Sequence, residues 1–469
     1  MNRRRSWRAV PITAVLAAIT SLTIGQGAAS AVEGSWAATG ALNQARIAQT
    51  ATLLADGKVL VAGGRATSGA LTSAELYDPL TETFTLTGAM STSRWSHTAT
   101  LLPDGRVLVA GGFTGFAPGN AQAVTDTAEV YDPASGTWSP AGTLGTRRAL
   151  HSAARLADGS VLVAGGRTCG NPPPATCDFS VRTNTAEIYH SATNTWSAAP
   201  PMNAPRHTTS ATVLHDGSVL IPAGFSAPDP HDTDRTADRY AGGAWSLTGN
   251  LVRARARQGA MTLPDGTVLV GPGSRETVCG PPVCQNGGPP FSAVIVDSSE
   301  LYNPTTDTWQ LTNGKPLVPG RFNFQQAVLP NGKALIAGGF GGPAGGEALQ
   351  QSAEVYNPAT GTWESAGTMT HLHATSSSLA NTHDAVVLSA NPWTFEYGAS
   401  CGSNCGKVLV LGDNLADPVA DLYTPTPPVP TTKDQCKRDG WKGRSTAANE
   451  PFRNQGLCVA YFNQSAKRR

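Results

Sequence analysis

The stretch from Arg94 to Gly112, RWSHTATLLPDGRVLVAGG, recurs along the chain, and this repetition constrains the fold more than any other feature. Aligned on the Asp-Gly turn (Asn-Gly in the last copy), further copies begin at Arg46, Arg148, Arg206, Arg255 and Arg321. Each copy predicts a half-buried strand, a two-residue hairpin of type I′ and an apolar strand that ends at Gly-Gly or a variant of it. Asp-Gly favours that hairpin because it accommodates the positive φ angles of the turn.

A second pattern follows each copy and predicts two more strands. In the second copy it reads AEVYDPASGTW, residues 128 to 138, with a tyrosine in one strand and a tryptophan in the next. The tyrosine recurs at intervals of 51 to 67 residues, as Tyr77, Tyr131, Tyr189, Tyr240, Tyr302, Tyr356 and Tyr423. Four short strands in a unit of about 50 residues are typical of a propeller blade. We therefore expect an all-β, seven-bladed β-propeller.

The two ends of the repeat region complement each other. Residues 32 to 42 contain Trp36 in a context that resembles the outer strand of other units, whereas the seventh unit ends after Tyr423 without such a strand. We expect the N-terminal strand to complete the last blade, because this pairing removes two exposed sheet edges.

The flanking segments predict three further parts of the chain. Residues 1–31 carry four arginines, then an apolar run and Ala29-Ser30-Ala31, which is the order of an export signal cleaved before Val32. The propeller is expected over residues 32–424 and a Pro/Thr linker over 425–432. Residues 433–469 form a basic C-terminal module. We expect a protein that is secreted, extracellular or associated with the cell wall, with no transmembrane segment after removal of the signal.

Eight cysteines fall into four near-neighbour pairs, which in an exported chain favours disulfide bonds. The pairs are Cys169 with Cys177, Cys279 with Cys284, Cys401 with Cys405, and Cys436 with Cys458. A metal site would need Cys-x-x-Cys spacing or a nearby histidine pair, and the sequence has neither.

Charge is distributed unevenly along the chain, although the net charge is only +1. The leader has no acidic residue, and residues 431 to 469 hold nine Lys or Arg against three Asp or Glu. The central region is therefore acidic, which argues against nucleic acid as its partner. The basic tail suits an anionic cell envelope.

The combination of Gly-Gly, an acidic residue before tyrosine, and tryptophan in units of about 50 residues resembles the kelch repeat family. The match extends over residues 33 to 424. The version LLPDGRVLVAGG is similar to secreted bacterial kelch proteins and to the propeller domain of galactose-oxidase-like proteins. The tail, with Lys433-Asp-Gln-Cys436 and Asn454-Gln-Gly-Leu-Cys458, resembles a short disulfide-bonded module of secreted bacterial proteins. The resemblance implies the fold, whereas function depends on the site.

The repeated arginines have two interpretations. They precede the first strand of each unit, at the end of the propeller that also receives the long loops, where they could bind an anion. An acidic residue also stands two positions before every repeat tyrosine, as Glu75, Glu129, Glu187, Asp238, Glu300, Glu354 and Asp421. Matched charges in each unit favour structural ion pairs over a ligand site.

Positions where the repeats differ are the better candidates for ligand contacts, since a repeat protein gains function where it departs from its own pattern. We select ligand-binding candidates at the loop-rich end of the propeller: Arg94, Trp95, His97, Arg148, His151, His207, Arg257, His371 and His373.

We expect a binding scaffold for a glycan or an extracellular protein, without a cofactor or metal. The alternative is a carbohydrate-active enzyme, either a galactose-oxidase-like oxidase or a polysaccharide lyase. The resemblance to the oxidases implies a copper site of two tyrosines, two histidines and a cysteine bonded to one tyrosine. Seven of the nine tyrosines here are repeat tyrosines, and the other two are Tyr397 and Tyr461. No catalytic residue can be assigned.

Overall fold

The computed structural model divides into two compact units, Met1–Ala31 and Val32–Arg469, and every residue that it describes belongs to the second. The described residues are 32–115, 123–169, 181–226, 233–278, 291–317, 320–342, 348–372, 385–388, 406–412 and 418–426. Their secondary structure is all β, and none of them forms a helix long and apolar enough to cross a membrane.

The described strands include seven four-stranded antiparallel sheets, each named here after its innermost strand. The β2 sheet contains β2 (Thr50–Leu53), β3 (Val59–Ala62), β6 (Ala74–Asp78) and β7 (Thr83–Thr87); the β8 sheet contains β8 (Thr98–Leu101), β9 (Val107–Ala110), β10 (Thr127–Asp132) and β11 (Thr137–Thr143); the β12 sheet contains β12 (Ser152–Arg155), β13 (Val161–Ala164), β14 (Ala186–His190) and β15 (Thr195–Ala199); the β17 sheet contains β17 (Thr212–Val213), β18 (Val219–Pro222), β20 (Ala237–Ala241) and β21 (Ala244–Leu247). The β22 sheet contains β22 (Ala260–Thr262), β23 (Val268–Val270), β26 (Glu300–Asn303) and β27 (Thr308–Leu311); the β29 sheet contains β29 (Gln325–Val328), β30 (Ala334–Ala337), β33 (Ser352–Asn357) and β34 (Thr362–Thr368); the β35 sheet contains β35 (Ala385–Val387), β36 (Val408–Leu411), β37 (Ala420–Thr424) and β1 (Ser35–Ala38).

Smaller ribbons extend from the loop-rich ends of several sheets. They are β4 (Arg65–Ala66) with β5 (Gly69–Ala70), β16 (Arg206–His207) with β19 (Phe225–Ser226), β24 (Gly273–Val278) with β25 (Phe291–Val296), and β28 (Arg321–Phe322) with β31 (Phe340–Gly341) and β32 (Ala348–Leu349).

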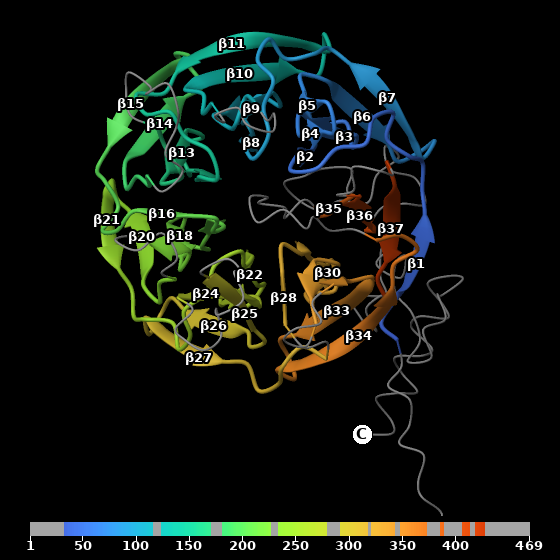
Figure 1. Ribbon diagram of the computed structural model, residues 1–469, viewed down its shortest axis with the longest axis vertical. Coiled ribbons are helices and arrows are strands. Elements are labelled where there is room, and N and C mark those ends of the chain that lie inside the picture. The colour runs from blue at the N-terminus through green and yellow to red at the C-terminus, as the bar shows by residue number, and fades with distance from the viewer. Residues whose placement is uncertain are drawn as a thin grey trace, which may run out of the picture. The chain divides into compact units, whose positions relative to one another are not determined.

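Neighbouring sheets follow one another around a common centre, in a propeller-like arrangement (Figure 1). The apolar second strands explain why, because their alternate residues face opposite neighbours. Val59 and Val61 of β3 lie in a cluster with Leu409 of β36, whereas Leu60 lies in a cluster with Val107 of β9. Buried on both faces, these strands need the continuous Val-Leu-Val-Ala run that the sequence repeats.

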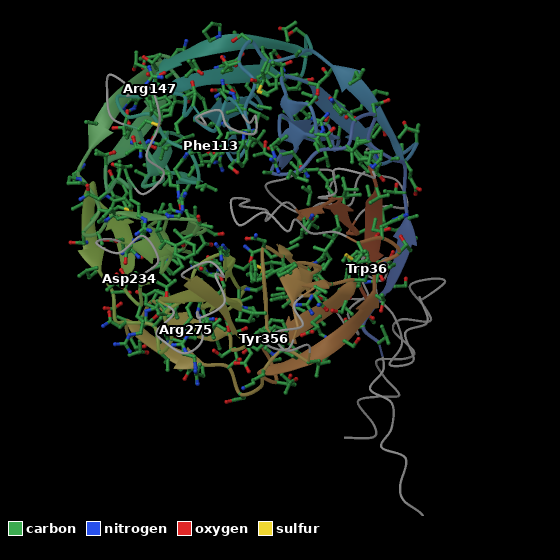
Figure 2. All side chains as sticks on the ribbon, in the orientation of Figure 1. Trp36, Phe113, Arg147, Asp234, Arg275 and Tyr356 are labelled. Atoms are coloured by element: carbon green, nitrogen blue, oxygen red, sulfur yellow. The ribbon has the colours of Figure 1, made fainter. Side chains whose placement is uncertain are left out.

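The N-terminal strand pairs with the last repeat, as the sequence indicated. Trp36 of β1 is aligned with Tyr423 of β37, and their ring centroids are 4.9 Å apart. The indole Nε1 of Trp36 donates to the carbonyl of Ala366 at 2.7 Å, so Trp36 joins the β35 and β29 sheets at their outer side (Figure 2).

The Asp-Gly turns differ from the predicted two-residue, type I′ hairpins. In the first repeat Leu54 and Lys58 close a three-residue loop, in which the Leu54 amide donates to the Lys58 carbonyl at 2.8 Å. Only Gly57 has a positive φ, of 86°, so the loop is a type I turn followed by a left-handed glycine. The Asp56 carboxylate accepts a hydrogen bond from the Lys58 amide at 3.1 Å, which explains the aspartate.

Six repeated arginines form buried ion pairs with the acidic residues, which supports the structural interpretation. Arg148 is typical: it donates to Glu187 at 2.7 Å, and to the carbonyls of Gly165 and Thr185 at 2.8 and 3.0 Å. The pairs are Arg46–Glu75, Arg94–Glu129, Arg148–Glu187, Arg206–Asp238, Arg255–Glu300 and Arg321–Glu354. By these hydrogen bonds each arginine connects the end of the second strand of its sheet to the start of the third strand.

A second repeated feature was not predicted: a main-chain belt at the loop-rich end of the innermost strands. Two positions after each arginine, a non-glycine residue has a φ between 50° and 58°. These residues are Ala48, Ser96, Leu150, Thr208, Arg257 and Asn323. The amide of each one from Ser96 onward donates to the carbonyl of the one before, at 3.0 to 3.2 Å. The belt therefore links six successive sheets by backbone hydrogen bonds.

Candidate functional site

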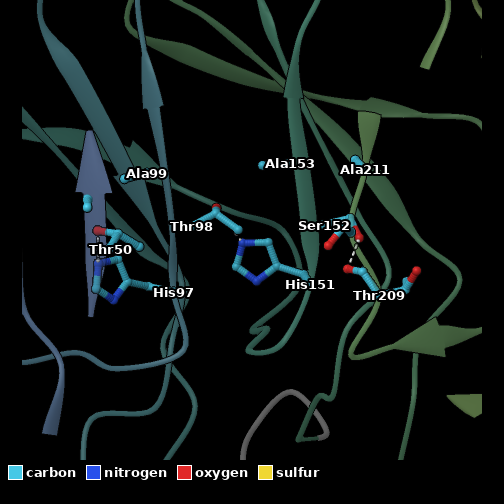
Figure 3. Close-up of a pocket in the computed structure, with 11 residues that line it drawn as sticks. Thr50, His97, Thr98, Ala99, His151, Ser152, Ala153, Thr209 and Ala211 are labelled. Carbon is cyan, nitrogen blue, oxygen red and sulfur yellow. Dashed lines mark hydrogen bonds between the residues drawn. The ribbon is translucent and has the colours of Figure 1, made fainter. Parts of the chain in front are cut away.

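A pocket lies just inside the belt, against the first residues of four neighbouring innermost strands (Figure 3). Its volume is about 200 Å³. It is lined by Thr50 and Ala51; His97, Thr98 and Ala99; His151, Ser152 and Ala153; and Thr209, Ser210 and Ala211. The lining has no Asp, Glu, Lys or Arg, and it is small, polar and uncharged.

The pocket wall follows a rule within the repeats. Four positions after the arginine, the first four repeats carry a hydroxyl residue, and the next position is alanine. The hydroxyl of each of these repeats bonds to the following repeat. Thr50 Oγ1 lies 3.0 Å from His97 Nε2 and Thr98 Oγ1 lies 2.8 Å from His151 Nε2. Ser152 Oγ donates to the Thr209 carbonyl at 2.9 Å. Ser210 Oγ donates to the Gln258 carbonyl at 3.4 Å. We call Thr50, Thr98, Ser152 and Ser210 the hydroxyl ladder.

The two histidines are held between glycines of neighbouring sheets. A Cβ on Gly63 would lie 2.9 Å from Cε1 of His97, and a Cβ on Gly112 would lie 2.9 Å from its Cβ. His151 has the same relation to Gly111 and Gly166. The Gly-Gly pairs therefore give these imidazoles their space, in addition to ending the second strands.

Both imidazoles are neutral at physiological pH. Burial, helped by the charge of Arg94, lowers the pKa of His97 to about 3. Burial, with the charges of Arg148 and His97, also lowers the pKa of His151 well below its ordinary value. The Nδ1 atoms of both rings are buried and have no hydrogen-bond partner within the described part of the chain.

The pair of Thr98 and His151 lacks one part of a catalytic triad among the described residues. Thr98 and His151 have the spacing of a nucleophile and a base, but a catalytic base is normally oriented by a third group on its other nitrogen. Nδ1 of His151 has no such partner among the described residues. No group of three or more His, Cys, Asp or Glu side chains in these residues could hold a metal ion.

The sequence-selected residues next to the histidines do not face the pocket. Arg94 and Arg148 are fully buried, and their terminal nitrogens donate to Glu129 and Glu187 and to carbonyls of their own sheets. Trp95 is 1% exposed and stacks on Phe113, with ring centroids 4.5 Å apart. The two arginines therefore brace their sheets, and Trp95 packs between the loops.

His207 and Arg257 belong to a separate cluster in the β17 and β22 repeats. Nε2 of His207 accepts a hydrogen bond from Nε of Arg167 at 3.3 Å. Arg257 lies over the ring of Phe225, with its guanidinium carbon 4.9 Å from the centroid. Burial lowers the pKa of His207 well below its ordinary value, and the charges of Arg167, Arg182 and Arg257 add to this effect. His207 is 1% exposed and Arg257 is 5% exposed, so neither presents a free surface.

His371 contacts the acidic residue of the seventh repeat. Its Nδ1 lies 3.0 Å from Oδ1 of the buried Asp421, the acidic residue of the seventh repeat. His373, expected at the arginine position of that repeat, lies outside the described residues. Cys169 is disulfide-bonded. The other predicted disulfide cysteines, Cys177, Cys279, Cys284, Cys401, Cys405, Cys436 and Cys458, lie outside the described residues as well.

The described residues do not fit the copper site of galactose-oxidase-like enzymes. Their seven tyrosines all lie in the third strands, where each pairs with an aromatic residue of the neighbouring outer strand, such as Tyr131 with Trp138. Tyr397 and Tyr461 are outside the described residues. No tyrosine therefore lines the pocket that His97 and His151 share.

Sequence reasoning found the two histidines but missed the hydroxyl ladder. Threonine and serine are common near strand ends, so none of the four residues stands out alone. The ladder can be recognised in the sequence only when the repeats are aligned, since Thr/Ser-Ala recurs at one position in four consecutive copies.

Comparison with known proteins identifies kelch motifs in the chain. The family described as Kelch motif matches residues 94–145, 148–203 and 325–370. A fungal alcohol oxidase of the AA5 family, solved in complex with copper, has a TM-score of 0.58 at 15% sequence identity, over 85% of this chain and 78% of that chain. The structure of YjhT has a TM-score of 0.51 at 15% identity, over 69% of this chain and 98% of that chain. No curated protein sequence matches the chain. At this level of identity the likeness shows a shared fold and nothing about activity.

Proposed function

We propose that this chain is a secreted kelch propeller of seven blades, closed by its N-terminal strand, that binds a glycan in the pocket between His97 and His151. The observation that carries the proposal is the pocket itself. It has the volume of a small ligand and a lining of hydroxyls, alanines and neutral imidazoles, without a charged side chain. Such a lining hydrogen-bonds to sugar hydroxyl groups and leaves room for a sugar ring.

The blade count is supported by the seven four-stranded sheets and by the pairing of β1 with β37. The export signal of residues 1–31, the linker of residues 425–432 and the disulfide-bonded module of residues 433–469 remain part of the proposal on their sequence patterns.

A glycan array tests the binding function directly. We expect the wild-type protein to bind a subset of immobilised glycans, and the variant His97→Ala/His151→Ala to lose that binding while it unfolds cooperatively on heating. The matched control is His97→Gln/His151→Gln, because glutamine occupies the equivalent position in two other repeats, as Gln49 and Gln258. A wild-type protein that binds no glycan would refute the proposal.

The alternative function is a carbohydrate-active enzyme, because one protein that shares this fold is an alcohol oxidase solved in complex with copper. Metal analysis of the purified protein and assays of hydrogen peroxide release on sugars separate the two functions. Stoichiometric copper together with peroxide release would replace the binding proposal by the oxidase. A polysaccharide lyase would need cationic side chains that neutralise a uronate, whereas Arg94 and Arg148 are engaged in ion pairs with Glu129 and Glu187.

The basic tail provides a second contact in the proposal, with an anionic cell envelope. Deletion of residues 431–469 should leave the thermal unfolding of the propeller unchanged and lower its retention on cell walls at low salt, since salt screens such contacts. Equal retention of the truncated and full-length proteins would contradict this part.

A further inference from the structure

We infer that the hydroxyl ladder gives the pocket a hydrogen-bond polarity, with donors at Thr50 and Thr98 and acceptors at Ser152 and Ser210, so that its ligand is a neutral sugar bound through adjacent hydroxyl groups. This inference rests on the proposed glycan-binding function and specifies which chemistry the pocket selects.

The acceptor end follows directly from the hydrogen bonds. A serine hydroxyl has one proton, and Ser152 and Ser210 donate theirs to the carbonyls of Thr209 and Gln258. Only oxygen lone pairs remain for a ligand. This end of the pocket therefore accepts hydrogen bonds from donor groups.

The donor end depends on the tautomers of the two histidines. Nε2 of His97 lies 3.0 Å from Thr50 Oγ1 of the preceding sheet, whereas Nδ1 is buried and has no hydrogen-bond partner among the described residues. The charge of Arg94, in the same repeat as His97, acts on this imidazole. A buried N–H without an acceptor is less favourable than a buried lone pair without a donor, so the unpartnered Nδ1 is the nitrogen without the proton.

The proton is accordingly assigned to Nε2, which donates to Thr50 Oγ1. The same argument applies to His151, Arg148 and Thr98. Each threonine then accepts from a histidine and keeps its own proton for the ligand. This end of the pocket donates hydrogen bonds.

The two ends together discriminate between ligand classes. A carboxylate only accepts hydrogen bonds, so it would leave the serine oxygens facing a negative charge without a proton between them. An ammonium group only donates, and it would oppose the threonine protons. A sugar hydroxyl both donates and accepts, so adjacent hydroxyls of a neutral pyranose satisfy both ends at once.

Titration calorimetry of the full-length protein tests the assignment. The probes are the methyl glycosides of glucose, mannose and galactose, with the corresponding uronic acids as charged counterparts. We expect at least one neutral glycoside to bind, and its uronic acid to bind at least tenfold more weakly. Thr98→Val and Ser210→Ala should each weaken the neutral glycoside roughly three- to tenfold, as expected for one neutral hydrogen bond.

Two control variants make the result interpretable. Thr98→Ser keeps the hydroxyl and should bind more tightly than Thr98→Val, so the difference between these two variants measures the missing hydrogen bond. Ser160→Ala removes a hydroxyl that bonds to Asp158 in a turn of the β12 sheet, away from the pocket, and should have no effect.

The outcomes separate the inference from the function on which it rests. If no glycoside binds, the inference fails, and the glycan array decides whether the glycan-binding function fails with it. If a glycoside binds but Thr98→Val and Ser210→Ala behave like Ser160→Ala, the ladder polarity is wrong while the binding function stands. Equal or tighter binding of the uronic acid would overturn the selection for neutral ligands.

Discussion

The two halves of the propeller centre share the buried arginine ion pairs and the main-chain belt, which we call the framework. They differ in the side chains at their inner positions. In the half built from the β2, β8, β12 and β17 sheets, the inner positions are small hydroxyls and alanines that line a pocket. In the β22 and β29 sheets the same positions are Gly259 and Ala260, and Gln325 and Gln326. Gln326 of the β29 sheet contacts the β22 sheet, where its Nε2 donates to the Ala260 carbonyl at 3.3 Å. The glutamine side chains thus fill space that the other half leaves open.

The difference shows how little change a repeat needs to make a site. A Cβ on Gly259 would lie 1.7 Å from Oε1 of Gln326, so a larger residue at the ladder position would displace the end of this glutamine side chain. The buried Arg148–Glu187 and Arg321–Glu354 pairs brace the two halves alike. Two inner positions per repeat therefore decide between a pocket and a filled centre.

The largest effect should come from the shared framework. Arg148→Met and Arg321→Met should each lower the free energy of unfolding by about 3–5 kcal/mol, because each leaves a buried carboxylate without its counter-ion. Urea denaturation measures both. Combining Arg148→Met with Glu187→Leu should restore most of the loss, and a clearly smaller cost in one half would show that the framework is not equivalent.

Acid should destabilise the pocket half more than the filled half. The pKa of His97 is lowered to about 3 in the folded protein and is about 6.5 in the unfolded chain, so the unfolded chain binds more protons between these values. The free energy of unfolding should therefore fall as the pH decreases from about 6.5, by about 1.4 kcal/mol per pH unit for each histidine that behaves in this way.

The variant His97→Gln/His151→Gln isolates this contribution. It should show a shallower decline of unfolding free energy between pH 7 and pH 4.5, with the remaining histidine effect due to His207. An unchanged slope would mean that these two imidazoles titrate normally in the folded state.

Filling the pocket should abolish binding at little cost in stability. Ala153→Gln introduces the residue that the β29 sheet carries at the same position, as Gln326. We expect glycan binding to weaken at least tenfold while the melting temperature changes by only a few degrees, since the position is partly exposed. Binding that persists would place the ligand elsewhere.

The smallest expected effect converts the filled half toward the pocket half. Gln326→Ala should cost about 1 kcal/mol, the value of one neutral hydrogen bond. Gly259→Ser alone should displace the end of the Gln326 side chain and break the same hydrogen bond, at a similar cost, so combining it with Gln326→Ala should add little. A double-mutant cycle by urea denaturation measures this coupling, and additive effects would contradict the close contact.

Much of the framework could be predicted because it depends on residues that the chain repeats. The arginines and the acidic residues before the tyrosines recur together, and buried charges need partners, so their pairing followed from spacing alone. The turn type was mistaken because Asp-Gly is compatible with more than one hairpin. Only the register of Leu54 and Lys58 shows that the loop contains a third residue.

The site was predicted only in part because sequence does not say which way a side chain points at a strand end. His97 and Trp95 are two residues apart, yet one lines the pocket and the other is buried against Phe113. Ser96 between them has a φ of 50°, which breaks the extended alternation of side chains. Nothing in a serine at that position predicts a left-handed backbone.

The main-chain belt that joins Ala48 through Asn323 has a consequence for how such a protein can change its specificity. Each left-handed residue costs roughly 1–2 kcal/mol in backbone strain, which the hydrogen bond to the next sheet helps to offset. The spacing of these six sheets is consequently determined by peptide groups, which every amino acid possesses. Side chains beside the belt can be exchanged without altering that spacing, so new recognition can evolve on a framework of constant dimensions.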